Sequence, residues 1–386
     1  MDKIRLILAI TLCALITSAC NTAAQDTAAK VDQRSYVTIG ALIGLSGDAA
    51  AYGVSQKKGI ELAVREINDS NYLAGNRELR LVVIDGGSSG DSAAAAISTL
   101  ISDNKVAAII GPTLSSQAFK ADPEAQKNSI PVMAVSNTVP GITAMGTMGN
   151  YIFRCSLPES SVIGGTIKAA ASQLRIVKVA YLWGSDDDYT RAGYQAFRDA
   201  VEKNGLQVLA DETFARGDTD FKAQLEKIIA RKPDAILVSA LAREASPIIK
   251  QARALGYTGL IIGGNGFNSP DLITQAGSDA EGVMAGTAWN IGNTNPRNLA
   301  FISAFQKAYG VQPDQFAAQA YTGTWLIANA VRTSRSNEPG AIRNALAEIA
   351  NFTTPLGSFS FDGSREPVHP SIVQIIRNGR FTVFNP

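Results

Sequence analysis

The feature that most constrains the fold of this sequence is a regular alternation of short apolar segments with amphipathic ones. Runs rich in Val, Ile and Leu are separated by segments whose apolar residues recur at helical spacing. Parallel strands need long crossover connections, which are usually helices, so this alternation predicts parallel sheets covered by helices. In the first half, strands are expected at 37–45, 79–85, 106–111 and 130–136, and helices at 52–70, 91–103 and 115–127.

The same alternation restarts beyond residue 155. Strands are expected at 177–183, 207–214, 235–240 and 260–263, and helices at 160–175, 189–204, 220–231 and 243–256. The predicted elements together cover about 350 residues, which is more than one hydrophobic core usually holds. The sequence therefore predicts two α/β lobes of about equal length.

After residue 290 the pattern becomes helical, over 296–309, 313–335 and 340–350. The chain closes with two apolar runs around Asn378-Gly379, a strong hairpin signal. We expect these later helices to return to the first lobe and the hairpin to join the second.

The N-terminus is typical of an exported protein. Lys3 and Arg5 precede an apolar run over 6–16, and the small residues Ser18 and Ala19 follow, which predicts a signal peptide over 1–19. Cys20 comes next, as in a bacterial lipobox, so we predict lipidation at Cys20; ordinary cleavage nearby without lipid is the alternative. Residues 20–35 are polar and Ala-rich, which predicts a flexible tether and a periplasmic or cell-surface lipoprotein.

Composition excludes several function classes. The formal net charge of +1 argues against nucleic-acid binding and against electrostatic binding to an anionic membrane. His369 is the single histidine. Cys13 lies in the predicted signal peptide and Cys20 is the predicted lipidation site, so Cys155 is the one cysteine left. We therefore expect no structural zinc site, and Cys155 is expected to be a buried, inert thiol. No G-x-G-x-x-G motif is present, and we predict no cofactor.

Polar residues follow the predicted strands where a ligand is expected. In open parallel sheets, ligands bind beyond the carboxyl ends of the strands. Ser115 and Ser116 follow the strand at 106–111, while Asn137 and Thr138 follow the strand at 130–136. Hydroxyls at a helix start suit a carboxylate; the alternatives are that serine there serves as a simple helix cap and that Thr138 only fixes a loop.

Several segments together carry a family resemblance. These are LSGDAAAYG with IELAVREIN, VAAIIGPTLSSQA, IPVMAVSNTVPGIT and LWGSDDDYTRAG. At these segments the sequence resembles the Leu/Ile/Val-binding family of type I periplasmic binding proteins, the substrate receptors of ABC importers for amino acids and amides. The resemblance implies two lobes, each a parallel sheet flanked by helices, joined by three crossover segments near 155–158, 286–289 and 357–362. It places 36–155 with 287–358 in lobe 1, and 156–286 with 359–386 in lobe 2.

The resemblance also implies roles for individual residues. Ser115 or Ser116, Thr138 and the backbone of Ser136 correspond to carboxylate anchors, Tyr52 covers the ligand side chain, and Tyr189 contacts the ligand from the second lobe. Two positions depart from the family pattern. Asn265 stands where a carboxylate would hold an α-ammonium, and Leu241 or Ala242 stands where a tyrosine is usual. Either an aspartate of 186–188 substitutes, or the ligand is not a zwitterion. The predicted ligand-binding residues are Tyr52, Ser115, Ser116, Ser136, Asn137, Thr138, Asp188, Tyr189 and Asn265.

These observations predict a non-enzymatic substrate-binding protein that delivers a small amino acid, carboxylate or amide to an ABC permease and ATPase complex. A ligand-sensing receptor with the same clamp is one alternative. A serine hydrolase is a weaker one, because residues 86–90 fit G-x-S-x-G around Ser88 and His369 follows later in the chain.

Overall fold

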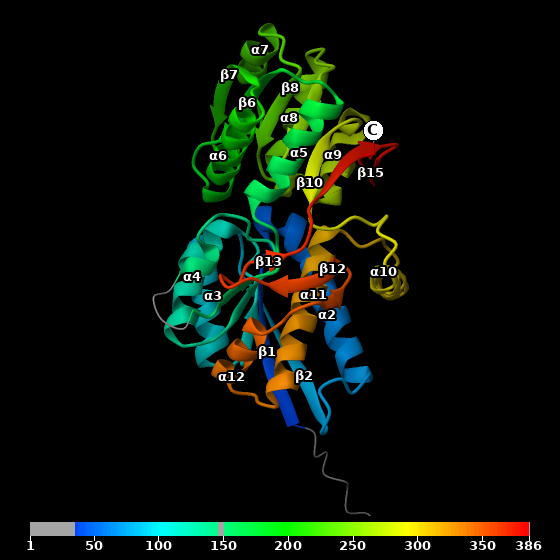
Figure 1. Ribbon diagram of the computed structural model, residues 1–386. Coiled ribbons are helices and arrows are strands. Elements are labelled where there is room, and N and C mark those ends of the chain that lie inside the picture. The colour runs from blue at the N-terminus through cyan, green and yellow to red at the C-terminus, as the bar shows by residue number, and fades with distance from the viewer. Residues whose placement is uncertain (1–34, 146–149, 386) are drawn as a thin grey trace, which may run out of the picture. The chain divides into compact units, whose positions relative to one another are not determined.

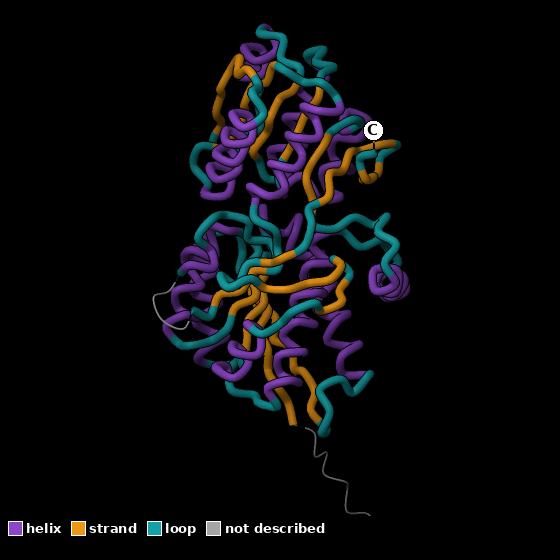
Figure 2. Tube along the Cα trace, in the orientation of Figure 1, coloured by secondary structure: helices purple, strands orange, loops and turns teal. Residues whose placement is uncertain are grey.

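The computed structural model describes residues 35–145 and 150–385. The predicted signal peptide, the lipidated Cys20 and the tether up to residue 34 therefore lie outside the described residues. Two sheets of mostly parallel strands, each flanked by helices, form the framework of the described chain (Figure 1, Figure 2), which confirms the predicted α/β fold class. Within the described residues no helix has the length and apolar character needed to cross a membrane.

The first sheet contains five strands in the order β2-β1-β3-β4-β5. The pairings β1–β3, β3–β4 and β4–β5 are all parallel. Side chains of β1 alternate between the two faces, as a strand buried on both sides requires: Ile39 and Ile43 pack on one face and Leu42 on the other. The strands are β1 (Ser35–Ile43), β2 (Arg77–Asp85), β3 (Ala108–Ile110), β4 (Val132–Ala134) and β5 (Ile152–Arg154).

Helices cover both faces of this first sheet. Helix α2 (Ala50–Asp69) lies beside α11 (Gln315–Ser334), and their apolar residues share one core with Ile39 and Ile43. Helices α3 (Gly90–Ser102) and α4 (Ser115–Lys127) pack together in the other core. The sequence prediction for these elements is confirmed to within a few residues at each end.

The second sheet contains seven strands in the order β15-β14-β10-β9-β8-β6-β7. Alternation along β6 again separates two cores, with Ala180 and Leu182 on one face and Val179 and Tyr181 on the other. Its strands are β6 (Lys178–Gly184), β7 (Gln207–Phe214), β8 (Ala235–Ser239), β9 (Leu260–Gly263), β10 (Met284–Thr287), β14 (Ile372–Arg377) and β15 (Arg380–Val383). Its helices are α5 (Glu159–Gln173), α6 (Asp188–Lys203), α7 (Lys222–Ala230), α8 (Ala242–Ala254) and α9 (Pro270–Ala276).

The last part of the chain divides between the two halves. Phe301 of α10 (Pro296–Tyr309) and Ile342 of α12 (Pro339–Ala347) lie in the same core as β1 and α11. The final hairpin adds β14 and β15 antiparallel to the edge of the second sheet, and its turn residues Asn378 and Gly379 both have positive φ. Both expectations for this region are therefore confirmed. The remaining short elements are β11 (Phe352–Thr354), β12 (Gly357–Phe361), β13 (Pro367–Val368), η1 (Gly47–Ala49), η2 (Ile142–Ala144), η3 (Asn265–Asn268) and η4 (Gly277–Ala280).

The membership of residues in the hydrophobic cores indicates where the chain crosses between its two halves. The first passage, at 155–158, lies between β5 and α5, and the second follows β10. The third was expected at 357–362, but Phe359 and Phe361 of β12 belong to the core of the first sheet. We therefore propose that lobe 1 extends through β13 and that the third crossover is 369–371. We call the first sheet with its helices and the β11–β13 sheet lobe 1, and the second sheet with its helices lobe 2.

Close backbone approach explains one glycine of α2. A Cβ on Gly59 would lie 2.3 Å from the carbonyl oxygen of Ala317 in α11, whereas a Cβ on Gly164 of α5 would meet nothing within 4 Å. Glycine costs helix stability at both positions, but only Gly59 permits a helix–helix contact in return.

We expect Gly59→Ala to destabilise the protein by about 1 to 3 kcal/mol, because backbone atoms of α11 must move. Gly164→Ala is the matched control, and it should stabilise the protein by up to about 1 kcal/mol. Denaturant unfolding of both variants measures this difference. Equal effects of the two substitutions would show that α2 and α11 do not approach this closely.

Candidate functional site

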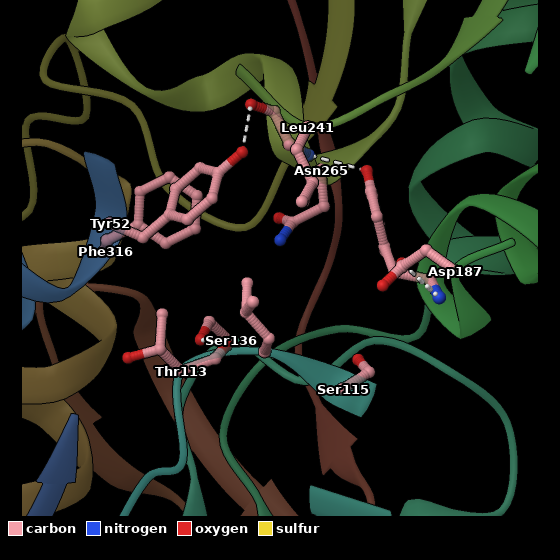
Figure 3. Close-up of a pocket in the computed structure, with 11 residues that line it drawn as sticks. Tyr52, Thr113, Ser115, Ser136, Asp187, Leu241, Asn265 and Phe316 are labelled. Carbon is pink, nitrogen blue, oxygen red and sulfur yellow. Dashed lines mark hydrogen bonds between the residues drawn. The ribbon is translucent and has the colours of Figure 1, made fainter. Parts of the chain in front are cut away.

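One pocket lies where the carboxyl ends of strands from both lobes meet (Figure 3). Its walls come from α2, from the loops that follow β3, β4, β6, β8 and β9, and from the first turn of α11. The pocket therefore lies where the strand-end rule for open parallel sheets expects a ligand. The lining residues are Tyr52, Thr113, Leu114, Ser115, Ser136, Asp187, Tyr189, Leu241, Asn265, Gly266 and Phe316.

A buried polar network supports the lobe 1 wall. Gln56 donates from Nε2 to the Ser136 hydroxyl at 2.7 Å and accepts from the Thr113 hydroxyl at 2.7 Å. Ser136 in turn donates to the carbonyl of Thr113 at 2.5 Å, and Thr113 Oγ1 accepts from Gly44 N at 2.9 Å. Because these hydroxyl protons are already committed, the network fixes the shape of this wall.

Ser115 and Thr138 form the part of the wall with unused donor capacity. Ser115 is the first residue of α4, whose N-cap is Leu114, so neither Ser115 nor Ser116 is the helix cap. The Ser115 hydroxyl accepts from Thr138 N at 3.2 Å, which leaves its proton free for a ligand. Thr138 is buried, and its Oγ1 meets no partner of good geometry within the described chain. The Thr138 side chain does interact with the buried Glu159 carboxylate: burial raises the pKa of Glu159, and this contact is one of those that oppose the rise. A ligand or a water molecule would complete the hydrogen bonding of this hydroxyl.

The aromatic part of the pocket joins the two lobes. The ring of Tyr52 packs on Phe316, with centroids 4.7 Å apart, and its hydroxyl reaches lobe 2. That hydroxyl accepts from Ala242 N at 2.7 Å and donates to the carbonyl of Gly266 at 3.3 Å. Burial raises the pKa of Tyr52 well above its ordinary value, so the group stays a neutral donor. Tyr52 therefore offers its ring to the pocket while its hydroxyl connects the lobes.

Tyr189 plays a comparable part on the lobe 2 side. Its hydroxyl accepts from Gly266 N at 2.7 Å and donates to Glu159 Oε1 at 3.3 Å. Both hydrogen-bonding directions are thus occupied by the protein. The surface that Tyr189 presents to a ligand is mainly its ring.

The three consecutive aspartates before Tyr189 have different environments. Asp187 is buried, lines the pocket and caps α6 by accepting from Tyr189 N at 2.9 Å. Asp188 instead has a side chain 41% exposed that pairs with Arg191 at 2.5 Å, and Asp186 accepts from Arg216 N at 2.9 Å. The structure therefore brings Asp187 to the pocket in place of the predicted Asp188, because α6 begins one residue after its cap.

The loop after β9 contributes Asn265 and Gly266. The Asn265 side chain accepts from Gln315 Nε2 of lobe 1 at 2.7 Å. Its backbone N–H donates to Glu159 Oε1 at 2.8 Å. Asn265 is therefore an interlobe contact at the pocket, and the nearest acid behind it is Glu159.

An ion cluster closes one side of the interface between the lobes. Asp48 of lobe 1 lies 2.5 Å from Arg243 and 3.3 Å from Arg216 of lobe 2. Arg216 also donates to the carbonyl of Ser88 at 3.1 Å and lies 3.7 Å from Asp187 Oδ2. The Asp48 side chain is only 15% exposed, so one carboxylate holds two arginines across the interface. We call Asp48, Arg216 and Arg243 the ion latch.

The pocket is nearly filled by its own walls. The centre of a water molecule has only ≈ 20 Å³ of space there, which is room for about one water. An amino acid would need the lobes to separate or the lining side chains to move. The two lobes are in contact across the pocket, and we call this arrangement the closed form.

The structure brings six of the nine predicted ligand residues to the pocket or directly beside it: Tyr52, Ser115, Ser136, Thr138, Tyr189 and Asn265. Ser116 and Asn137 are not among the lining residues, although the buried side chain of Asn137 has no partner for either of its polar atoms among the described residues. Sequence reasoning missed Gln56, Thr113, Phe316 and Glu159. Glu159 follows a proline at a helix start, a pattern that also fits an ordinary exposed acid.

The surroundings of Ser88 do not support the serine hydrolase alternative. The Ser88 hydroxyl accepts from Ala49 N at 2.9 Å and donates to the carbonyl of Ser46 at 2.9 Å. His369, half-buried in the loop after β13, has its ring near Phe359 and its Nδ1 near the carbonyl of Pro370. The free Cys155 is buried as expected, and burial raises the pKa of its thiol. Within 35–145 and 150–385, no cluster of three or more metal-ligating side chains is present.

Comparisons with known proteins agree with this geometry. A family model described as "Periplasmic binding protein" matches residues 36–380. Leu/Ile/Val-binding protein homolog 2 of Brucella abortus is 26% identical, and the match covers 90% of this chain and 92% of that protein.

Two solved structures are similar over nearly the same length. The substrate binding protein LivJ from Streptococcus pneumoniae, solved in complex with isoleucine, is 30% identical with a TM-score of 0.84, covering 91% of this chain and all of that one (100%). The leucine binding protein LivK from Thermotoga maritima is 26% identical with a TM-score of 0.84, covering 90% and 98%.

The fold and the interlobe pocket define a two-lobe solute-binding protein, and the chain belongs to the periplasmic binding protein family. The resemblance to the Leu/Ile/Val-binding proteins seen in the sequence is confirmed. Members of this family are solute receptors, which agrees with the prediction that the chain is not an enzyme.

The ion latch leads to a prediction for closure. We expect Asp48→Asn to favour the open form by about 1 kcal/mol, because a neutral amide cannot hold two arginines. Small-angle X-ray scattering in low salt should give a larger radius of gyration for Asp48→Asn than for the wild type.

Salt should open the wild type but not this variant, since it screens only charged pairs. The exposed Asp69 at the end of α2 supplies the control, Asp69→Asn, which should behave like the wild type. An identical salt response of Asp48→Asn and the wild type would contradict a role for the ion latch.

Proposed function

We propose that this protein is the substrate-binding component of an ABC transporter and that it captures a small amino acid or related carboxylate or amide between its lobes. One observation carries the proposal: a pocket at the carboxyl ends of both sheets whose walls are joined across the lobes by Tyr52. Similarity to LivJ, whose structure contains isoleucine, and to the leucine binding protein LivK supports amino acids as the ligand class.

Neutral donors on lobe 1 suit the carboxylate of such a ligand. The free proton of Ser115, the unpartnered hydroxyl of Thr138 and the first N–H groups of α4 lie at one place. Helix N-termini favour oxyanions, and none of the described residues that line this wall has a cationic side chain that would bind other anions strongly. The apolar lining, Leu114, Leu241 and the aromatic rings, then receives the ligand side chain.

The closing motion supplies selectivity. In the closed form Tyr52, Gln315 and the ion latch make hydrogen bonds and ion pairs across the lobes. A ligand that allows these contacts to form is held in a site with little water, where each polar contact is stronger. A ligand that is too large keeps the lobes apart and is released.

We further propose that the protein acts outside the cytoplasmic membrane, tethered by a lipid on Cys20, and delivers its ligand to an ABC permease and ATPase. Replacement of Cys20 by serine should then release the protein from the membrane fraction. A ligand-sensing receptor is the second candidate. Deletion of the gene should abolish uptake of the ligand for a transport component, whereas it would leave uptake intact for a sensor.

Thermal-shift screening tests the proposed ligand class directly. We expect the melting temperature to rise with at least one amino acid or small carboxylate or amide. A panel of proteinogenic amino acids, their oxo and amide analogues and aromatic acids covers the class. No shift with any member of the panel would contradict the proposal.

Thr138 provides a sharper prediction. Thr138→Val should weaken binding of a carboxylate ligand by about 1 to 3 kcal/mol, because a buried ligand oxygen loses its donor. Thr322 of α11 is the matched control, since its hydroxyl is also buried without a partner in the described chain but lies outside the pocket. Titration calorimetry should show that Thr322→Val leaves affinity unchanged. Unchanged affinity in Thr138→Val as well would contradict the assignment of Thr138.

A further inference from the structure

Gln315, the first residue of α11, is part of lobe 1, but its buried side chain bonds to groups outside lobe 1. It is 2% exposed. Its Oε1 accepts from the Thr287 hydroxyl at 2.5 Å and from Ala288 N at 2.7 Å, where β10 ends and the second crossover begins. Its Nε2 donates to Asn265 Oδ1 at 2.7 Å, in the loop after β9 that lines the pocket. One buried amide therefore joins the second crossover to the pocket wall.

Gln315 is also a member of a row of five amide side chains. Asn290 Nδ2, just beyond the second crossover, donates to Gln374 Oε1 at 2.8 Å, and Gln374 Nε2 donates to Asn268 Oδ1 at 2.6 Å. Asn268 Nδ2 lies 3.5 Å from Gln315 Oε1, the longest step, and Gln315 Nε2 continues to Asn265. Each amide nitrogen thus points to the oxygen of the next amide. We call these five residues the amide row.

The amide row is buried and carries no charge. Its members are between 2% and 6% exposed. Hydrogen bonds arranged head to tail polarise one another in a low-dielectric interior, and a buried polar atom that loses its partner is costly. A change at one link therefore alters the free energy of the others. The row is also anchored to the backbone of β10, because Asn268 Nδ2 donates to the carbonyl of Gly286 at 2.8 Å.

One end of the amide row faces the ligand site. Figure 3 shows the side chain of Asn265 directed into the pocket. Its Oδ1 is used by Gln315, so its Nδ2 is the atom left to meet a ligand or a water molecule. The row therefore runs from the second crossover to a pocket group that a ligand can contact.

A second buried glutamine of α11 shows that these links depend on position. Gln319 stands one turn after Gln315 and is 0% exposed, but neither polar atom of its side chain has a partner among the described residues. Burial on α11 alone thus does not give a glutamine the bonds that Gln315 makes. Gln319 is the matched control for Gln315.

We propose that Gln315 is a positioning residue that couples the pocket loop after β9 to the second crossover. It holds Asn265 in the closed position only while Thr287 and Ala288 hold Gln315 itself. Closure over a ligand and the conformation of the crossover are then one step. The consequence for ligand capture rests on the proposed function, whereas the coupling is a property of the protein without a ligand.

Amide hydrogen exchange at Ala288 measures the link directly, because Ala288 N donates to Gln315. Gln315→Met keeps an unbranched side chain of similar size but removes the amide. We expect exchange at Ala288 to be at least about 10-fold faster in Gln315→Met than in the wild type. Gln319→Met should exchange at Ala288 as the wild type does. Slow exchange at the buried Ile39 of β1 shows that each variant is folded.

A double-mutant cycle separates coupling from local packing. Asn265→Ala removes the acceptor of Gln315 Nε2 and should speed exchange at Ala288 several-fold, although Asn265 makes no hydrogen bond to Ala288 within the described chain. Added to Gln315→Met, the same substitution should have no further effect at Ala288, because the connection is already absent. Asn265→Ala also tests the link on its own if Gln315→Met does not fold.

The contrary outcomes distinguish this inference from the proposed function. Unchanged exchange at Ala288 in Gln315→Met, additive effects in the cycle, or equal effects of Gln315→Met and Gln319→Met would overturn the coupling and leave the proposed function standing. For an amino acid that binds the wild type, titration calorimetry should show at least about 10-fold weaker binding to Gln315→Met. Failure of the wild type to bind any member of the ligand panel would count against the proposed function, while the exchange measurements would still decide the coupling.

Discussion

The hydroxyl of Tyr52 is the contact on which the closed pocket depends. Tyr52 stands in the first turn of α2, and its ring rests on Phe316 while its oxygen bonds two backbone groups of lobe 2, Ala242 N and the carbonyl of Gly266. A single side chain thus covers the pocket and links the lobes at the same place. Because the hydroxyl has partners in both directions, it holds the closed form without demanding a polar group from the ligand.

The other contacts between the lobes lie on either side of Tyr52 or farther along the interface. Gln315 and Asn265 meet beside the pocket, and the ion latch spans the interface at Asp48. Buried neutral hydrogen bonds thus lie at the pocket and charged pairs lie where water still reaches them. Charges are costly to bury, so the partly exposed ion latch can form and break as the lobes close and reopen while its side chains stay in reach of water.

Much of the fold follows from sequence pattern, since each β1 or β6 residue must alternate between two apolar cores and Asn378-Gly379 suits the turn of a hairpin. The strand-end rule likewise predicts Ser115, Thr138 and Tyr189. Local pattern cannot distinguish Asp187 from Asp188, because a shift of one residue in the helix start exchanges a buried cap for an exposed ion pair. Nor does it identify Glu159, whose burial arises only when the loop after β9 packs over α5.

We propose that one ligand binds the lobe 1 donors and is enclosed by lobe 2 once the lining side chains have moved to admit it. A crystal structure of the protein with the amino acid that stabilises it most would test this claim directly. We expect a ligand carboxylate within hydrogen-bond distance of Thr138 Oγ1 and Ser115 Oγ, with Tyr52 still bonded to lobe 2. A ligand bound elsewhere, or bound in this pocket with the lobes apart, would contradict this proposal.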